Sequence, residues 1–166
     1  MAPKETHGEF GERVARNGVR GFSGARLRRY RDGLDLTIDD LADAAGVSPQ
    51  AISSWETARS APTPHLLSRV ARILNVTVAD LVPIPQGRWR LHDLRVHAGL
   101  TQADAANALA MSPTQLARFE KGRKEFSETV AHAMTVLYGV SDSVLKTTWD
   151  RTVQDREHTT TRIRES

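Results

Sequence analysis

Apolar residues recur at helical spacing in several short stretches of the chain. Within the segment 64–74 they fall every three or four positions, at Leu66, Leu67, Val70, Ile73 and Leu74. Within 49–56, Ile52 and Trp55 share one face, while the opposite face is polar and carries Gln50, Ser53, Ser54 and, just beyond, Thr57. The pattern predicts short amphipathic helices, each of which turns one face toward a core.

The same pattern occurs twice, without gaps, at an offset of 64 residues. Residues 36–59 read LTIDDLADAAGVSPQAISSWETAR, and residues 100–123 read LTQADAANALAMSPTQLARFEKGR. Upstream positions keep the register, since Arg26, Leu27 and Arg31 match Arg90, Leu91 and Arg95. A repeat of this length is a whole small domain rather than a solenoid unit.

Capping signals mark where helices begin in each copy. Thr37 with Asp40, and Thr101 with Asp104, form the T-x-x-D pattern of a reciprocal N-cap, which opens the second helix. A Ser-Pro pair at 48–49 and again at 112–113 supplies a hydroxyl cap and a proline at the first helical position, which opens the third helix. About three residues separate the second helix from the third, so a tight turn is expected there.

Residues that accept a left-handed conformation mark where helices end. The first helices, at about 23–33 and 88–98, are expected to end near Gly33 and Gly99. The fourth helices are expected to end at Asn75 and Gly139, and a short fifth helix follows in each copy. The predicted fold is therefore all-α, with two tandem five-helix domains.

Polar, glycine-rich and proline-rich stretches set the expected boundaries. The polar ends are expected to be flexible tails, and the two prolines of the segment VPIPQG indicate a linker. The predicted organisation is an N-terminal tail at 1–21, a first domain at 22–83, a linker at 84–87, a second domain at 88–150 and a C-terminal tail at 151–166.

Composition narrows the functional classes. The chain has 39% hydrophobic and 26% charged residues, no cysteine, six scattered histidines and a net charge of +3. No metal-ligand spacing, Walker-type loop or G-x-S-x-G motif is present, so neither an enzyme nor a cofactor is expected. No apolar run suits a membrane span or a secretory signal, and a cytoplasmic location is expected.

The outward face of each third helix carries the candidate chemistry. Short hydroxyls, an amide and one arginine stand at the start of these helices, and such groups read base edges in a DNA major groove. The same residues also suit an ordinary solvated helix face, so the pattern alone leaves both readings open. In the second copy the corresponding positions are Thr114, Ala117, Arg118 and Lys121, with Leu116 and Phe119 facing inward.

Four features in each copy resemble the Cro and phage-repressor (Xre-type) helix-turn-helix family. They are the L-T pair before the second helix, a small residue within it (Ala42, Ala106), the S-P pair, and an aromatic-Glu pair that ends the third helix. The resemblance covers 22–83 and 86–149. It implies two lambda-repressor-like domains in which the third helix enters the major groove and the second lies across the backbone.

The resemblance also assigns roles to residues of this chain. It implies base contacts from the third helices, by Pro49, Gln50, Ser53, Ser54, Pro113, Thr114, Ala117 and Arg118. It implies phosphate contacts at the ends of the second and third helices, by Thr37, Arg59, Thr101, Gln102, Lys121 and Arg123. Arg31 with Glu56, and Arg95 with Glu120, are expected to form partly buried ion pairs that support the fold.

Departures from the family pattern qualify these expectations. The first copy has Ile38 where a phosphate-binding glutamine is usual, and Asp39 and Asp40 would face phosphate poorly. The second copy has Ala110 where glycine normally makes the turn between helices, at a cost of roughly 1 kcal/mol, so an altered turn is expected. The second copy is expected to hold the backbone more strongly.

Two functions are compatible with these features. The first is a sequence-specific, double-stranded-DNA-binding transcriptional regulator, either a repressor or an activator, acting as a homodimer or as an intrachain pseudo-dimer. The alternative is a protein-interaction module of a regulatory complex, antitoxin-like or RNA-polymerase-binding, in which one helix-turn-helix has lost its DNA contacts.

Overall fold

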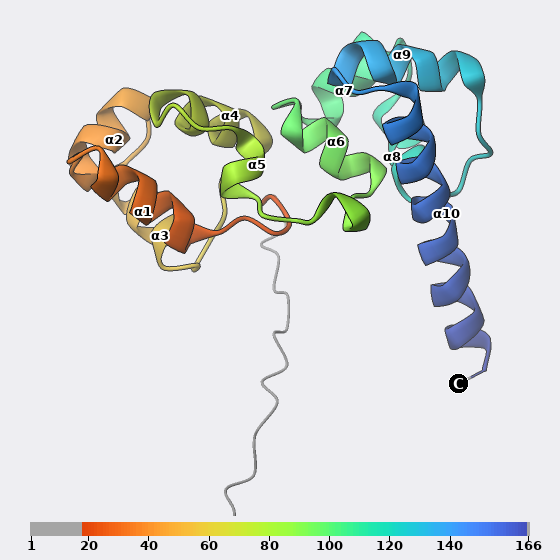
Figure 1. The fold of residues 1–166 in the computed structure, drawn as a ribbon, viewed down its shortest axis with the longest axis horizontal. Coiled ribbons are helices and arrows are strands. Elements are labelled where there is room, and N and C mark those ends of the chain that lie inside the picture. Colours follow the sequence, from red (N-terminus) through yellow and green to blue (C-terminus); the bar gives the residue numbers. More distant parts are fainter. Residues whose placement is uncertain (1–17, 166) are drawn as a thin grey trace, which may run out of the picture.

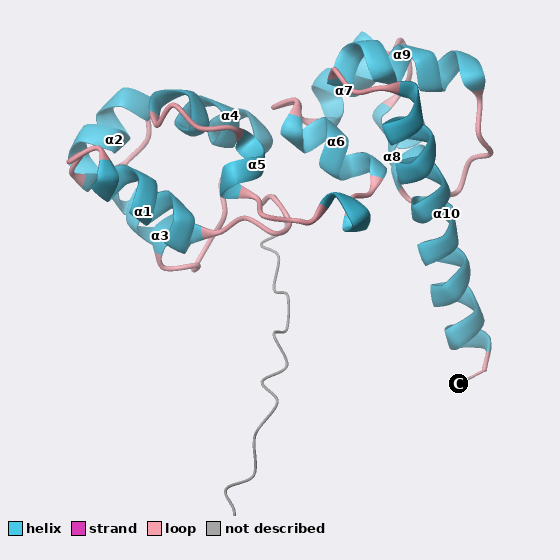
Figure 2. Cartoon of the chain, in the orientation of Figure 1, coloured by secondary structure: helices cyan, strands magenta, loops and turns pink. Residues whose placement is uncertain are grey.

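The computed structural model describes residues 18–165, which fold into helices with no strand among them (Figures 1 and 2). The predicted all-α class and the tandem arrangement are confirmed. The first five helices are α1 (Gly24–Gly33), α2 (Ile38–Ala45), α3 (Pro49–Glu56), α4 (Pro64–Ile73) and α5 (Val78–Leu81). After a short 3-10 turn (Gln86–Arg88) follow α6 (Leu91–His97), α7 (Gln102–Ala108), α8 (Pro113–Glu120), α9 (Glu128–Tyr138) and α10 (Asp142–Arg164).

The helix starts agree with the capping signals in the sequence. Thr37 and Thr101 each form a capping box with the aspartate three residues later. Ser48 and Ser112 cap α3 and α8, and a proline occupies the first turn of each helix. These caps satisfy backbone N–H groups that would otherwise lack partners. The predicted starts of the second and third helices are therefore confirmed.

Left-handed residues recur at the repeat offset, with one glycine in each pair. The pairs are Asp35 and Gly99, Gly46 and Ala110, Ala58 and Gly122, and Asn75 and Gly139. Asn75 and Gly139 therefore end the fourth helices as predicted. Helix α1 also ends at Gly33, as expected, but Gly33 itself remains helical and Asp35, two residues later, takes the left-handed conformation. Aspartate tolerates this conformation because its short polar side chain bonds locally.

Two hydrophobic clusters form the cores, one in each half of the described chain. The first contains Leu27, Leu41, Ile52, Leu67 and Leu81, all fully buried. The second contains their counterparts in the repeat together with Met134 and Trp149. Val96 of α6 belongs to the first cluster although it lies in the second half of the chain, so α6 links the two cores.

The two halves are in direct contact through α6, which touches α4 and α5 (Figure 1). Arg20 Nη2 lies 2.7 Å from the buried carboxylate of Asp93, at the start of α6. A Cβ added to Gly99 would lie 2.6 Å from Ser68 Oγ, which shows how closely the loop after α6 approaches α4. The halves are therefore packed together rather than joined only by a linker.

The expected tails differ from the structure at both ends. Residues 1–17 lie outside the described residues, but residues 18–21 are not a free tail, since Val19 is buried and Arg20 is ion-paired. At the other end α10 continues to Arg164, where a flexible tail was expected from 151 onward. Thr148, Trp149 and Thr152 anchor this helix, and extending an anchored helix requires no new nucleation.

Candidate nucleic-acid interface

The helices α3 and α8 are fixed by their inward faces. Ile52 and Trp55 of α3 are buried in the first core, and Leu116 and Phe119 of α8 are buried in the second. The outward faces are left to solvent: Gln50 and Ser53 are exposed on α3, and Thr114 and Arg118 are exposed on α8. Each domain thus presents a short polar surface on a helix whose rotation is set by its core contacts.

The turns that precede α3 and α8 have the same geometry. Gly46 and Ala110 both have positive φ, 68° and 53° respectively. The residue after each donates its backbone N–H to a carbonyl five residues earlier, at 3.0 Å in both copies. The expectation of an altered turn at Ala110 was therefore wrong. Alanine adopts the left-handed conformation in place, because the packing on both sides of the turn determines it.

A bidentate ion pair ties the end of each outward-facing helix to the first helix of its domain. Arg31 Nε lies 2.6 Å from Glu56 Oε1, and Arg31 Nη2 lies 3.0 Å from Oε2. Both side chains are nearly buried. The hydrogen bond to Glu56 raises the pKa of Arg31 above its ordinary value against the opposing effect of burial.

The second domain repeats this pair and adds a third partner. Arg95 Nε lies 2.5 Å from Glu120 Oε1, and Nη2 lies 3.3 Å from Oε2. In each domain the arginine also donates to the carbonyl just before the second helix, at Leu36 or Leu100. Gln102 donates to Glu120 Oε2 at 2.9 Å. The amide that family resemblance assigned to phosphate is therefore engaged with the ion pair.

The base-contact candidates lie on α3 and α8 and differ in exposure and in whether their side chains already have hydrogen-bond partners. Gln50, Ser53, Thr114 and Arg118 are exposed, and their side chains form no hydrogen bond with any described residue. Ser54 is half-buried, and its Oγ lies 2.7 Å from Ser60 Oγ, so its hydroxyl already has a partner. The remaining members lie at the first helical position or on the flank of the same face: Pro49, Pro113 and Ala117.

The phosphate-contact candidates separate into two groups. The hydroxyls of Thr37 and Thr101 donate to the capping aspartates, so they hold the helix starts rather than facing solvent freely. Arg59, Lys121 and Arg123 are exposed beyond the ends of α3 and α8, and none forms an ion pair with any described residue. Among these candidates the unpaired positive charge therefore lies after the ends of α3 and α8 rather than at the starts of α2 and α7.

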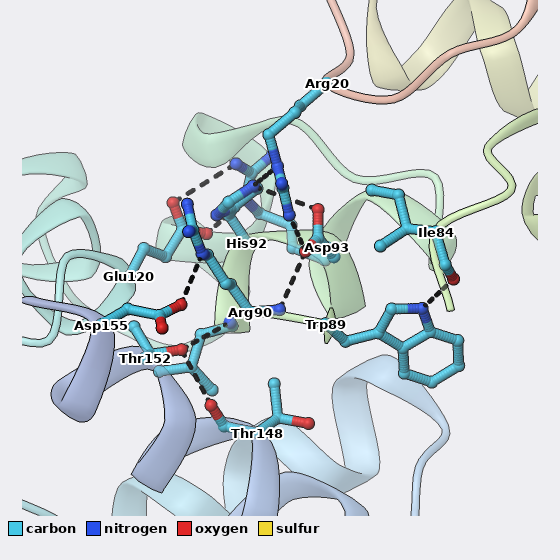
Figure 3. A network of polar contacts seen from close by, with 12 residues as sticks. Arg20, Ile84, Trp89, Arg90, His92, Asp93, Glu120, Thr148, Thr152 and Asp155 are labelled. Atoms are coloured by element: carbon cyan, nitrogen blue, oxygen red, sulfur yellow. Dashed lines mark hydrogen bonds and ion pairs between the residues drawn. The ribbon is translucent and has the colours of Figure 1, made fainter. Parts of the chain in front are cut away.

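A polar network that sequence reasoning missed surrounds the start of α6 (Figure 3). Arg20 donates to His92 and Asp93, Arg90 donates to Asp155 at 2.9 Å, and the backbone N–H of residue 91 donates to Thr152 Oγ1. These partners are 61 to 73 residues apart in the sequence. No local pattern could have indicated them, because neither helical period nor capping links such distant positions.

The described residues hold no group of three or more His, Asp or Glu side chains placed to bind a metal ion. Within the same range, no helix is sufficiently long and apolar to cross a membrane.

Comparison with known proteins gives one kind of match. A family model described as helix-turn-helix matches residues 27–81, and a second, described as helix-turn-helix domain, matches residues 88–147. No curated protein and no solved structure matches the chain. The two matched ranges coincide with the two halves in which α3 and α8 present their outward faces.

Proposed function

Because the chain consists of two helix-turn-helix domains in tandem, the first of the Xre/Cro type, we propose that it is a sequence-specific regulator of transcription. In this proposal α3 and α8 enter the major groove of duplex DNA and read base edges. The proposal includes no catalytic step and no cofactor.

The observation that carries the proposal is the doubled outward face of α3 and α8. Both helices begin with a serine cap and a proline, and the positive end of the helix dipole at this position favours an anionic partner. Gln50 on α3 and Arg118 on α8 supply the amide and guanidinium groups that pair bidentately with adenine and guanine. A third helix that is buried on one face and polar on the other is suited to reading base edges in the major groove.

The two domains contribute unequally to DNA binding in this proposal. The first domain, 22–83, carries seven arginines against seven acidic residues, so its net charge is near zero. In the second, Lys121 and Arg123 stand free beyond α8. Phosphate contacts dominate affinity for DNA, so the second domain contributes most of the binding energy.

The contacts between the halves favour an intrachain pseudo-dimer. Paired helix-turn-helix units bind half-sites spaced by about one helical turn, ~34 Å. Here the ion pair of Arg20 with Asp93, together with Val96 in the first core, holds the two units in one arrangement. One chain therefore supplies both recognition helices, and the domains engage neighbouring parts of one site.

One observation favours the alternative function for the first domain. Asp39 and Asp40 are exposed at the start of α2, where the family places its backbone contact, and both would repel phosphate. Under this alternative the second domain binds DNA and the first binds a protein partner. The two functions differ in how much of the DNA site is specified.

Selection from random duplexes tests the proposal. The wild-type chain is expected to enrich one sequence that it binds with nanomolar affinity, and the affinity should fall steeply with salt as phosphate contacts release counterions. A single enriched half-site would favour the alternative function for the first domain. If no sequence is enriched over bulk DNA, the proposed function is wrong.

A further inference from the structure

The C-terminal half of α10 borders a groove beside the turn that follows α8. The groove has a volume of about 570 Å³. Lys121 and Arg123 line it from the turn, Arg156 and Ile163 line it from α10, and Arg90 lines it from the start of α6. Figure 1 shows this half of α10 extending past the other helices of the second domain.

Direct contacts hold the turn against α10. Arg156 Nη1 donates to the carbonyl oxygen of Gly122 at 3.4 Å. A Cβ added to Gly122 would lie 2.8 Å from the backbone oxygen of Thr152 and 3.0 Å from the Cα of Val153, so the turn lies on the helix backbone. Because Gly122 separates Lys121 from Arg123 in the chain, the Arg156 guanidinium lies beside both of the exposed cations.

The groove carries an excess of positive charge. Its two carboxylates already have arginine partners, since Glu120 is paired with Arg95 and Asp155 with Arg90. Lys121, Arg123 and Arg156 are exposed and form no ion pair within residues 18–165. An anionic partner would therefore meet three unpaired cations on one side of α8.

The first domain has no equivalent of this groove wall. Its fifth helix, α5, has four residues and ends at Leu81, whereas α10 has 23 residues. The turn after α3, which contains Thr57, Ala58 and Arg59, lies at the corresponding place with a single arginine. The extended helix is thus a feature that only the second domain adds to the shared scaffold.

We propose that this groove holds the sugar–phosphate backbone of duplex DNA beside the bases read by α8, with Arg156 as an additional phosphate contact. The inference rests on the proposed function and extends its interface onto α10. A backbone that reaches Lys121 and Arg123 passes the Arg156 guanidinium, whose planar donor fork suits phosphate oxygens. Charge complementarity selects this occupant, since three unpaired cations line one groove and the DNA backbone is a polyanion.

Salt titration of the selected duplex with Arg156→Gln tests the inference. Glutamine removes the charge, and the turn is expected to stay in place because Gly122 packs on the backbone of Thr152 and Val153. The variant should bind several-fold more weakly at moderate salt, and its slope of log affinity against log salt should fall by about one. Its preferred sequence should equal that of the wild type, because phosphate contacts are not base-specific.

Lys146→Gln is the matched control. Lys146 is an exposed cation of the same helix that is paired with Asp150, and it lies ten residues, about 15 Å, before Arg156 and outside the groove. This variant should keep the wild-type salt slope. The melting temperature of each variant is also measured, so that a loss of affinity can be distinguished from a loss of stability.

The outcomes separate this inference from the proposed function. If the wild type enriches no duplex, the proposed function fails and the inference fails with it. If the wild type binds selectively and Arg156→Gln keeps its salt slope, the inference alone is overturned. The inference is also overturned if Arg156→Gln melts at a lower temperature than the wild type and prefers a different sequence. It is overturned as well if inorganic phosphate stabilises the wild type but not Arg156→Gln, while both proteins bind DNA with equal affinity.

Discussion

At corresponding positions of the two domains, inward residues agree in character and outward residues differ. Ile52 and Trp55 of α3 have the apolar counterparts Leu116 and Phe119 on α8. The outward positions pair Gln50 with Thr114, Ser53 with Ala117 and Ser54 with Arg118. One scaffold therefore presents two different polar surfaces, and the proposal assigns a different part of the DNA site to each.

Arg118 and Arg123 should lose different kinds of binding when replaced by alanine. Arg118 is exposed on α8 one turn beyond Thr114, and the proposal pairs its guanidinium with guanine O6 and N7, so Arg118→Ala should cost about 1–3 kcal/mol at one base pair. Arg123 lies past the helix end, so Arg123→Ala should weaken all sequences alike and lower the salt slope by about one.

Competition titrations against single-base variants of the selected site measure this difference. The two arginine variants serve as controls for each other, because both remove one exposed positive charge from the same domain. An equal loss on every sequence for Arg118→Ala would show that Arg118 holds phosphate and does not read a base.

The buried ion pair should matter for stability and not for base reading. Removing one member leaves the other as an unpaired buried charge, so Arg31→Ala or Glu56→Ala should lower the free energy of unfolding by about 3 kcal/mol or more. Denaturant unfolding measures this loss. A variant that unfolds like the wild type yet no longer binds the selected duplex would instead make Arg31 or Glu56 a DNA contact.

The sequence predicted single residues where a local pattern or the family resemblance included them. The spacing of 25 residues between arginine and glutamate recurs in both copies, and the structure contains both pairs. Gln102 was assigned to phosphate, whereas its amide donates to Glu120, which lies 18 residues away. Nothing in the sequence distinguishes an amide directed at a buried carboxylate from one directed at solvent.

At the scale of elements, helix starts were predictable and helix ends were less so. A capping residue bonds within its own turn, so Thr37, Thr101 and the two Ser-Pro pairs revealed the starts directly. The end of α10 depends on contacts with distant segments, such as that between Asp155 and Arg90. Its polar, threonine-rich sequence therefore suggested a tail where the structure has a helix.

The turn between α7 and α8 should be improved by glycine. Ala110 has φ of 53°, a strained value for alanine, and its counterpart in the first domain is Gly46. Ala110→Gly should raise the free energy of unfolding by up to about 0.5 kcal/mol, the left-handed strain less the entropy cost of glycine. Ala108→Gly, an exposed helical site nearby, is the matched control and should lower it by a similar amount.

Denaturant unfolding of both alanine variants checks the sign of each effect. If Ala110→Gly and Ala108→Gly destabilise the protein equally, then the turn at Ala110 is not left-handed and the two helix-turn-helix units differ in geometry.

At the scale of the whole molecule, the packing of the two domains against each other was the feature least predictable from the sequence. The linker prolines suggested separate units, yet Arg20 reaches Asp93 across 73 residues and Val96 enters the first core. A contact of this kind joins single residues from distant segments, so the periodic pattern of apolar residues does not predict it. The arrangement decides whether α3 and α8 act on one site together.

Acidification should loosen this packing through Asp93. Burial alone would raise the pKa of Asp93, but contact with His92, the backbone N–H of Arg90 and the charge of Arg20 hold it below its ordinary value. A carboxylate with a lowered folded pKa stabilises the fold above its unfolded pKa of 3.8, and this contribution is lost as the pH falls below that value.

Asp93→Asn should therefore be less stable than the wild type at neutral pH and lose less stability as the pH falls from about 4 to about 2. Unfolding by denaturant across this range measures both effects. Parallel pH curves for the two proteins would show that the carboxylate of Asp93 does not hold the domains together.

The most direct test of the central claim exchanges the outward face of α8 for that of α3 and repeats the selection from random duplexes. The triple variant Thr114→Gln, Ala117→Ser and Arg118→Ser keeps the buried Leu116 and Phe119, so it should fold with stability close to that of the wild type. The wild type should enrich a site of two different parts, and the variant should change only the part read by α8, toward the sequence read by α3. If the variant enriches the same site as the wild type, α8 does not read DNA and the account is contradicted.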